Sequence, residues 1–96
     1  MLQTIINAIR NREVLLFTYS GFDRTVQPAA VGESRAGKDV IRCYQTAGGH
    51  VTPGHEWDLC EISKVSNLRA NGQHFSGEPP GYKRGDKGMV KIYAEL

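Results

Sequence analysis

Hydrophobic residues recur at helical spacing only at the start of the chain. Residues 2–11 read LQTIINAIRN, and the apolar positions that fall on one stripe of a helix are Leu2, Ile5, Ile6 and Ile9. Asn11 is expected to end this helix, because asparagine tolerates the left-handed conformation that is common at helix ends. The pattern predicts a short amphipathic helix over 2–11.

After this helix, apolar and polar residues alternate, which is typical of strands. The segments are joined by short links rich in turn-forming residues, such as SGFD at 20–23. Pro28 cannot donate to a strand ladder, so it is expected at an edge or a bulge. Five strands are predicted, over residues 14–19, 24–31, 40–46, 55–62 and 89–96.

These elements fit one mainly β domain of the α+β class. The 96 residues are too few for two independent cores, so 1–96 is predicted to be a single domain. A strongly bent five-stranded antiparallel sheet, with the helix over one opening, would form an SH3-like or Sm-like barrel. Residues 63–88 are predicted to be a long irregular loop with one helical turn near 64–68, followed by the closing strand at 89–96.

Composition sets limits without indicating a function. The net charge of +2 is too small to indicate nucleic-acid binding by itself. Cys43 and Cys60 lack the dense spacing of a secreted disulfide scaffold and are predicted to be small buried residues. No apolar run approaches the length of a membrane span and no signal-peptide pattern opens the chain, so we expect a soluble cytoplasmic protein without a membrane partner.

Several segments, in order, resemble one protein family. AIRNREVLLFTYSGFDRTVQPAAVG, IRCYQT and HEWDLCEISKVSNL combine a helix ending in Ala-Ile with an aliphatic strand ending in Tyr. They also place an Arg and a Pro in the second strand, and a late aromatic-x-Leu pair followed by Ile. This arrangement, within residues 2–75, is similar to the WYL domain.

The resemblance implies a small Sm-like or SH3-like barrel that senses nucleic acid or nucleotide-type ligands. Bacterial regulators most often carry such a domain beside a winged-helix DNA-binding segment. No helix-turn-helix segment is visible here, so the resemblance predicts a stand-alone domain that takes part in transcriptional or defence regulation. Two departures are that His55 and Glu61 stand where the family usually has basic residues, and that residues 76–96 have no counterpart in the usual pattern.

Arg42 and Tyr44 are the strongest candidates for ligand binding. Alternation places both on one face of a strand, where a guanidinium can fork onto a phosphate and a phenol ring can stack on a base. The resemblance adds Arg24, at the family's basic position after the first hairpin. The competing interpretations are a solvated outer face for Arg42 and Tyr44, and a surface ion pair of Arg24 with Asp23 or a neighbour.

His55 and Trp57 share one face of the predicted strand 55–62. An imidazole at a strand start could donate to an anion, and an indole ring could form the floor of a pocket. Tyr19 is a further, minor candidate. Simple exposure is the competing interpretation for His55, and core packing is the competing interpretation for Trp57 and Tyr19.

Neither a metal site nor a catalytic constellation is visible in the sequence. The metal-capable side chains lack zinc-type spacing; they are His50, His55, His74, Cys43 and Cys60. We therefore predict no metal, no cofactor and no enzymatic activity. The basic, glycine-rich stretch GYKRGDKG at 81–88 could touch phosphates, although a solvated loop is the simpler interpretation.

Together these patterns predict a non-enzymatic module that binds a nucleotide, an oligonucleotide or another anionic ligand. Arg42, Tyr44, His55 and Arg24 would bind it, with Tyr19 and Trp57 in support. This hypothesis requires cationic side chains from separate segments to lie together at one binding site. The alternative is a protein-interaction or homo-oligomerisation module whose closing strand pairs with another chain.

Overall fold

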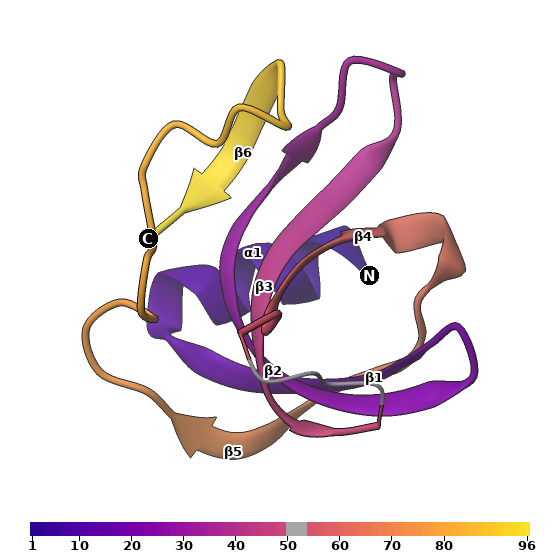
Figure 1. The fold of residues 1–96 in the computed structure, drawn as a ribbon, viewed down its shortest axis with the longest axis vertical. Helices are drawn as coiled ribbons and strands as arrows, with labels where there is room; N and C mark the ends of the chain where they lie inside the picture. Colours follow the sequence, from indigo (N-terminus) through magenta and orange to yellow (C-terminus); the bar gives the residue numbers. More distant parts are fainter. Residues whose placement is uncertain (50–53) are drawn as a thin grey trace.

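The computed structural model describes residues 1–49 and 54–96 (Figure 1). Its elements in chain order are α1 (Leu2–Asn11), β1 (Glu13–Tyr19), β2 (Phe22–Glu33), β3 (Asp39–Gly48), β4 (Trp57–Glu61), η1 (Ile62–Lys64), β5 (Ser66–His74) and β6 (Lys91–Glu95). His50 lies outside the described residues. Within the two described ranges, no helix has the length and apolar character needed to cross a membrane.

All six strands belong to one antiparallel sheet. Its hydrogen-bonded order is β4-β3-β2-β1-β5, and β6 pairs with β2 outside this path. The predicted mainly β, α+β fold with an N-terminal helix is confirmed. The sheet has six strands where five were predicted, and it does not close into an SH3-like or Sm-like barrel. In the described part of the chain β4 and β5 end the strand order with no ladder between them.

β5 forms within the stretch that the sequence predicts to be an irregular loop, 63–88. It pairs with β1, with Leu15 opposite Ala70. Pattern analysis misses this strand because SNLRANGQH is almost entirely polar and exposed, so no alternation marks one face. The helical turn predicted near 64–68 lies earlier, as the 3-10 turn η1. Residues 75–90 do form a long irregular stretch, called the outer segment below.

The helix α1 lies behind the sheet in Figure 1 and packs its apolar stripe against it. Ile5 and Ile9 of the predicted stripe are buried, as is Ala8, whereas Leu2 and Ile6 are partly buried. Arg12, rather than Asn11, adopts the left-handed conformation that ends the helix, with φ of 52°. Its backbone N–H donates to the carbonyl oxygens of the last turn, and this satisfies groups that a helix end would leave unpaired.

The strand β2 is the longest and changes partners along its length. Its first half pairs with β1 and its second half with β6, while β3 pairs with both halves. Between Pro28 and Ala30 the register with β3 shifts by one residue, which is the bulge expected at this proline. Gly32 lets β6 approach, because a Cβ there would overlap the carbonyl oxygen of Lys91.

Both faces of the sheet carry hydrophobic clusters. The inner face packs on α1, with Leu15, Phe17, Val26, Ile41, Cys43 and Cys60 among its buried residues. Both cysteines are buried free thiols, as predicted. The outer face carries a smaller cluster made by Ala30, Val40 and Met89, with Leu59 and Ile92 against it. Met89 belongs to the outer segment, which therefore covers the outer face of the sheet.

Candidate functional site

The predicted ligand-binding residues fall on two faces of the sheet. Arg42 lies opposite Ala30 and Leu59, which belong to the outer cluster. Arg24 lies opposite Phe17, which belongs to the inner core. The bulge after Pro28 explains this, because one extra residue reverses which positions of β2 face α1. The cationic side chains of Arg24 and Arg42 therefore do not lie together at one binding site.

A pocket of about 350 Å³, called the outer pocket below, opens between the outer face of the sheet and the outer segment. Arg42 and Trp57 line it from the sheet, and residues 81–87 line it from the other side. Its size lies at the lower end of the range for small-molecule sites. The sequence identified Arg42 and Trp57 but treated the GYKRGDKG stretch as a solvated loop. The structure places most of that stretch along the pocket wall.

Several contacts hold the outer segment, and three of them involve side chains that line the pocket. The Trp57 Nε1–H donates to the carbonyl oxygen of Pro80 at 2.8 Å. The Arg42 guanidinium forms an ion pair with Asp86, and the Tyr82 hydroxyl donates to the main-chain oxygen of Leu96 at 3.0 Å. These contacts come from three different points of an otherwise irregular stretch, so they shape the pocket that it covers.

The Arg42–Asp86 pair is the electrostatic centre of the pocket. Arg42 Nε and Nη2 donate to the two carboxylate oxygens of Asp86, at 2.7 and 3.1 Å. The Arg42 side chain is 30% exposed and that of Asp86 only 10%. The hydrogen bond from Arg42 holds the pKa of Asp86 below its ordinary value, and the same bond raises the pKa of Arg42. Both groups are therefore charged at neutral pH.

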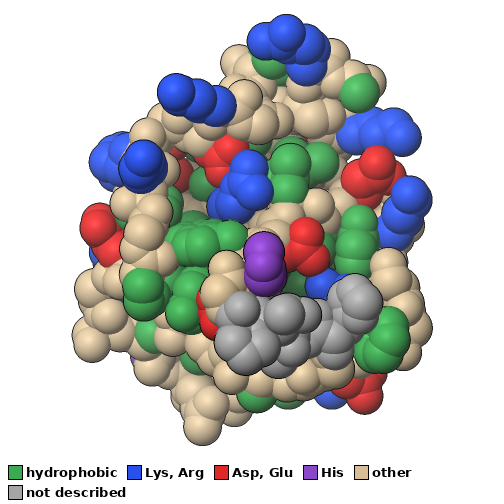
Figure 2. Space-filling view, viewed as in Figure 1, with side chains coloured by type: hydrophobic (Ala, Val, Ile, Leu, Met, Phe, Trp, Pro, Cys, Tyr) green, Lys and Arg blue, Asp and Glu red, His purple; other side chains and the backbone are tan. Residues whose placement is uncertain are grey.

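Further cations stand at the rim of this pocket. Lys83 and Lys87 are exposed, and neither forms an ion pair with a carboxylate in the described ranges. Arg84 pairs with Glu95, with Nε and Oε1 3.1 Å apart. Figure 2 shows Lys and Arg side chains gathered over the upper part of the molecule, where the β2–β3 hairpin and the end of the outer segment lie in Figure 1.

Tyr44 supports the pocket from behind. It lies opposite Trp57 on the neighbouring strand, and the two rings meet edge to face with centroids 5.3 Å apart. Tyr44 is not among the residues that line the cavity. The predicted pairing of Arg42 and Tyr44 on one face therefore holds, and Tyr44 buttresses the indole ring that forms the pocket wall.

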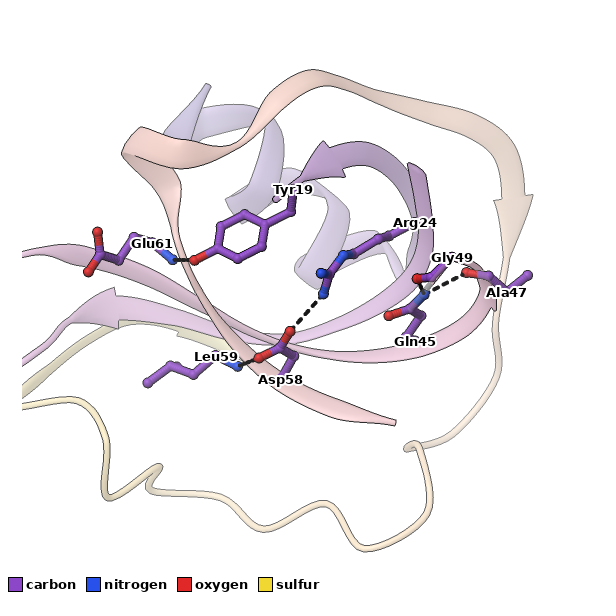
Figure 3. Close-up of polar contacts among 8 residues, drawn as sticks. All are labelled: Tyr19, Arg24, Gln45, Ala47, Gly49, Asp58, Leu59 and Glu61. Atoms are coloured by element: carbon purple, nitrogen blue, oxygen red, sulfur yellow. Dashed lines mark hydrogen bonds and ion pairs between the residues drawn. The ribbon is translucent and has the colours of Figure 1, made fainter. Parts of the chain in front are cut away.

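Arg24 belongs to a separate polar cluster at the inner face (Figure 3). Its side chain is 5% exposed, and Nη1 donates to an Asp58 carboxylate oxygen at 2.8 Å. The guanidinium carbon lies 5.2 Å from the centre of the Tyr19 ring. Arg24 Nε is buried without a hydrogen bond in the described residues. The competing interpretation, a surface ion pair with Asp23 or a neighbour, is right that Arg24 forms an ion pair, but the partner is Asp58 and the Arg24 side chain is buried.

Of the other members of this cluster, one links β1 to β4, and another bonds to backbone groups close to it in the chain. The Tyr19 hydroxyl accepts a hydrogen bond from the backbone N–H of Glu61 at 3.1 Å. Gln45, which is 5% exposed, donates through Nε2 to the carbonyl oxygens of Ala47 and Gly49. Because these polar groups bond chiefly to one another and to the backbone, the cluster acts as part of the fold.

His55 lies outside both groups. β4 begins at Trp57, so His55 precedes the strand and is exposed. Among the described residues, no three His, Cys, Asp or Glu side chains come close enough together to hold a metal ion. Asp86 is the pocket residue that sequence reasoning missed, because nothing in the pattern links it to Arg42 at a separation of 44 residues.

Comparisons with protein-family models, with curated proteins and with solved structures find no match to this chain. The resemblance to the WYL domain therefore stays a prediction.

Proposed function

We propose that this protein is a non-enzymatic binding module for a nucleotide, an oligonucleotide or a similar anionic ligand, and that the ligand occupies the outer pocket. The observation that carries the proposal is the composition of the pocket wall. An indole ring and a guanidinium face a glycine-containing segment that bears further cations. Aromatic rings bind bases by stacking, and cations bind phosphates.

Each pocket residue has a distinct role in this proposal. Trp57 offers an apolar wall to a base, and its ring is fixed by Tyr44 and by the hydrogen bond to Pro80. Lys83 and Lys87 supply net positive charge, because the charge of Arg42 is balanced by Asp86.

The wider biological role depends on the sequence resemblance alone. A WYL-like sensing domain in a transcriptional or defence regulator would use a pocket of this kind. Arg24, Tyr19 and His55 have no part in this version of the proposal, because they lie away from the pocket wall.

Trp57 allows a direct test, because it is the only tryptophan of the chain and lines the pocket. ADP, cyclic nucleotides and a short oligothymidylate are titrated while Trp57 fluorescence is followed, at about 50 mM salt and again at about 200 mM. We expect a saturable change in fluorescence that weakens at the higher salt concentration. The double variant Lys83→Gln, Lys87→Gln should bind at least about tenfold more weakly.

The matched control is the double variant Arg10→Gln, Arg69→Gln, which removes the same charge from exposed positions on α1 and β5. It should bind like the wild-type protein. Equal weakening of both double variants would indicate a diffuse charge effect and would remove the pocket from the proposal. The absence of binding by any probe at either salt concentration would overturn the proposed function.

A second candidate function is strand pairing with another chain, and the edge of β5 favours it. β5 has nine residues, nearly all exposed, and within the described sheet it pairs only with β1. The closing strand, by contrast, already pairs with β2 of its own chain. An unpaired strand edge is a ready template for a further strand.

Light scattering over a range of protein concentrations tests this candidate. An oligomer that Ala70→Lys on β5 dissociates, and that Gln3→Lys on α1 leaves intact, would support it. A monomer at all concentrations would rule out self-association through this edge.

A further inference from the structure

The outer pocket contains an anionic group of its own chain. Both carboxylate oxygens of Asp86 accept hydrogen bonds from Arg42, one from Nε and one from Nη2. This edge presents two parallel N–H donors, which is the geometry that carboxylates and phosphates share as ligands. Both side chains line the cavity, so the preferred anion-binding edge in the pocket is already occupied.

The two partners are held very differently. Arg42 projects from β3, whose backbone is paired with β2 on one side and β4 on the other. Asp86 projects from the outer segment, which forms no strand at this point. The segment is held beside Asp86 by a backbone bond from Met89 N to Asp86 O at 3.2 Å, by the buried Met89 side chain, and by a bond from Val90 N to Glu33 O at 2.8 Å. Of the two side chains, Asp86 is therefore the one that can withdraw.

Asp86 also has a local role that can be separated from the ion pair. Its Oδ1 accepts a hydrogen bond from the Gly88 backbone N–H at 2.8 Å. An asparagine at this position keeps an oxygen for that bond and removes the negative charge from Arg42. The variant Asp86→Asn thus removes the charge and the acceptor for Arg42 Nε, which weakens the hold on the guanidinium while the turn is retained.

We propose that Asp86 is a resident competitor for Arg42, and that an anionic ligand binds the outer pocket by displacing the Asp86 carboxylate from the guanidinium edge. This inference depends on the proposed function of the pocket. The carboxylate has the advantage of being tethered, which gives it a high effective concentration. A phosphate-bearing ligand offsets this advantage because it can contact Lys83 and Lys87 at the same time. The affinity of the wild-type pocket for an anionic ligand is therefore lower than it would be if Asp86 did not bind the Arg42 guanidinium.

A simpler role for Asp86 predicts the opposite result. If Asp86 only positions Arg42 and the outer segment for the ligand, its removal should weaken binding. If Asp86 competes, removal of its charge should strengthen binding. The sign of the change in affinity distinguishes these roles.

The experiment titrates ADP against wild-type protein and the Asp86→Asn variant, and follows Trp57 fluorescence. We expect the variant to bind about ten- to a hundredfold more tightly, the equivalent of one charge-assisted hydrogen bond. The control is Glu78→Gln, which removes an exposed carboxylate from the same segment. Its affinity should stay within about twofold of the wild-type value, because an exposed charge outside the pocket is screened by solvent and salt.

A second variant, Asp86→Ser, protects the test against a change in the turn. Serine can also accept the bond from the Gly88 N–H but carries no charge, so it should shift the affinity in the same direction. Circular dichroism confirms that each variant is folded.

Each outcome separates the two proposals. Weaker or unchanged ADP binding by both folded Asp86 variants overturns the competitor and leaves the pocket as a binding site. ADP binding only after the charge is removed supports the competitor strongly. No binding of ADP by wild type or variant overturns the competitor, and the proposed function is overturned as well if the cyclic nucleotides and the oligothymidylate also fail to bind.

Discussion

Two Arg–Asp pairs lie on opposite faces of one sheet, and they differ in which partner is buried. On the inner face, Arg24 is 5% exposed and Asp58 is 43% exposed. On the outer face the order is reversed, with Arg42 30% exposed and Asp86 10%. The inner pair therefore hides a cation, whereas the outer pair leaves a cation at a pocket and hides the anion.

The two arginines also differ in the groups that hold them. Arg24 lies against the Tyr19 ring and bonds to a carboxylate on a neighbouring part of the sheet, so its position is fixed by the fold. Arg42 is held by a residue of the irregular outer segment. The same chemical pair thus serves the fold on one face and lines the proposed ligand site on the other, and the two pairs differ in the burial of the cation.

The largest expected effect is the loss of stability on replacing Asp58. In the Asp58→Asn variant, Arg24 keeps its charge in a buried site, where Nε already lacks a hydrogen bond. We expect the free energy of unfolding to fall by about 2 to 3 kcal/mol, because a buried charge without a counter-ion is costly. Urea denaturation followed by circular dichroism measures the change.

Asp23→Asn is the matched control for this prediction. Asp23 is an exposed acid of β2 that accepts a hydrogen bond from the Thr18 hydroxyl. Its replacement should change the stability by less than about 0.5 kcal/mol. A similar small change in Asp58→Asn would mean that the inner pair is no more structural than an ordinary surface contact.

Periodicity located α1 and five of the six strands, because apolar residues recur in each of them at helix or strand spacing. In β1, for example, Leu15 and Phe17 are buried, whereas Leu16 and Thr18 are only partly buried. β5 could not be found in this way, since its residues are exposed on both sides. The failure to close into a barrel likewise depends on long-range pairing that no local pattern records.

The candidate site was only half predictable from the sequence. Alternation placed Arg42 and Tyr44 on one face correctly. It could not place Arg24, because the bulge after Pro28 reverses the facing of every earlier residue of β2. It also could not find Asp86, because an ion pair between a strand and an irregular segment leaves no local pattern in the sequence.

A smaller effect is expected for the outer pair, and it should depend on pH. The lowered pKa of Asp86 means that its ionised form stabilises the fold above the ordinary carboxyl pKa. That contribution is lost as the pH falls through the folded-state pKa. At neutral pH we expect Asp86→Asn to be about 1 kcal/mol less stable than the wild-type protein, since Arg42 is partly exposed to solvent.

Urea denaturation at several pH values tests this dependence. The difference between wild type and Asp86→Asn should narrow as the pH falls below about 4. Glu78→Gln, which changes an exposed carboxylate, serves as the reference for general charge effects. A difference that stays constant down to the acid limit would show that the ion pair with Arg42 is not its source.

The smallest effect is expected at Gly88, which packs closely on the outer pair. A Cβ there would lie 3.1 Å from Arg42 Nη2, 3.1 Å from Asp86 Oδ1 and 3.3 Å from Leu59 Cδ2. These neighbours are ends of side chains that can shift, so Gly88→Ala should cost less than about 1 kcal/mol. The shift would loosen the bond between Arg42 and Asp86, and the two substitutions Gly88→Ala and Asp86→Asn should therefore not be additive.

A double-mutant cycle measured by urea denaturation gives the coupling between these substitutions. We expect at least about 0.5 kcal/mol between Gly88→Ala and Asp86→Asn, because both act on the same ion pair. The matching cycle with Asp58→Asn should be additive, since Asp58 belongs to the inner pair on the other face. Equal coupling in both cycles would mean that the two pairs respond as one network, and the contrast between the structural inner pair and the outer pair at the proposed ligand site would no longer hold.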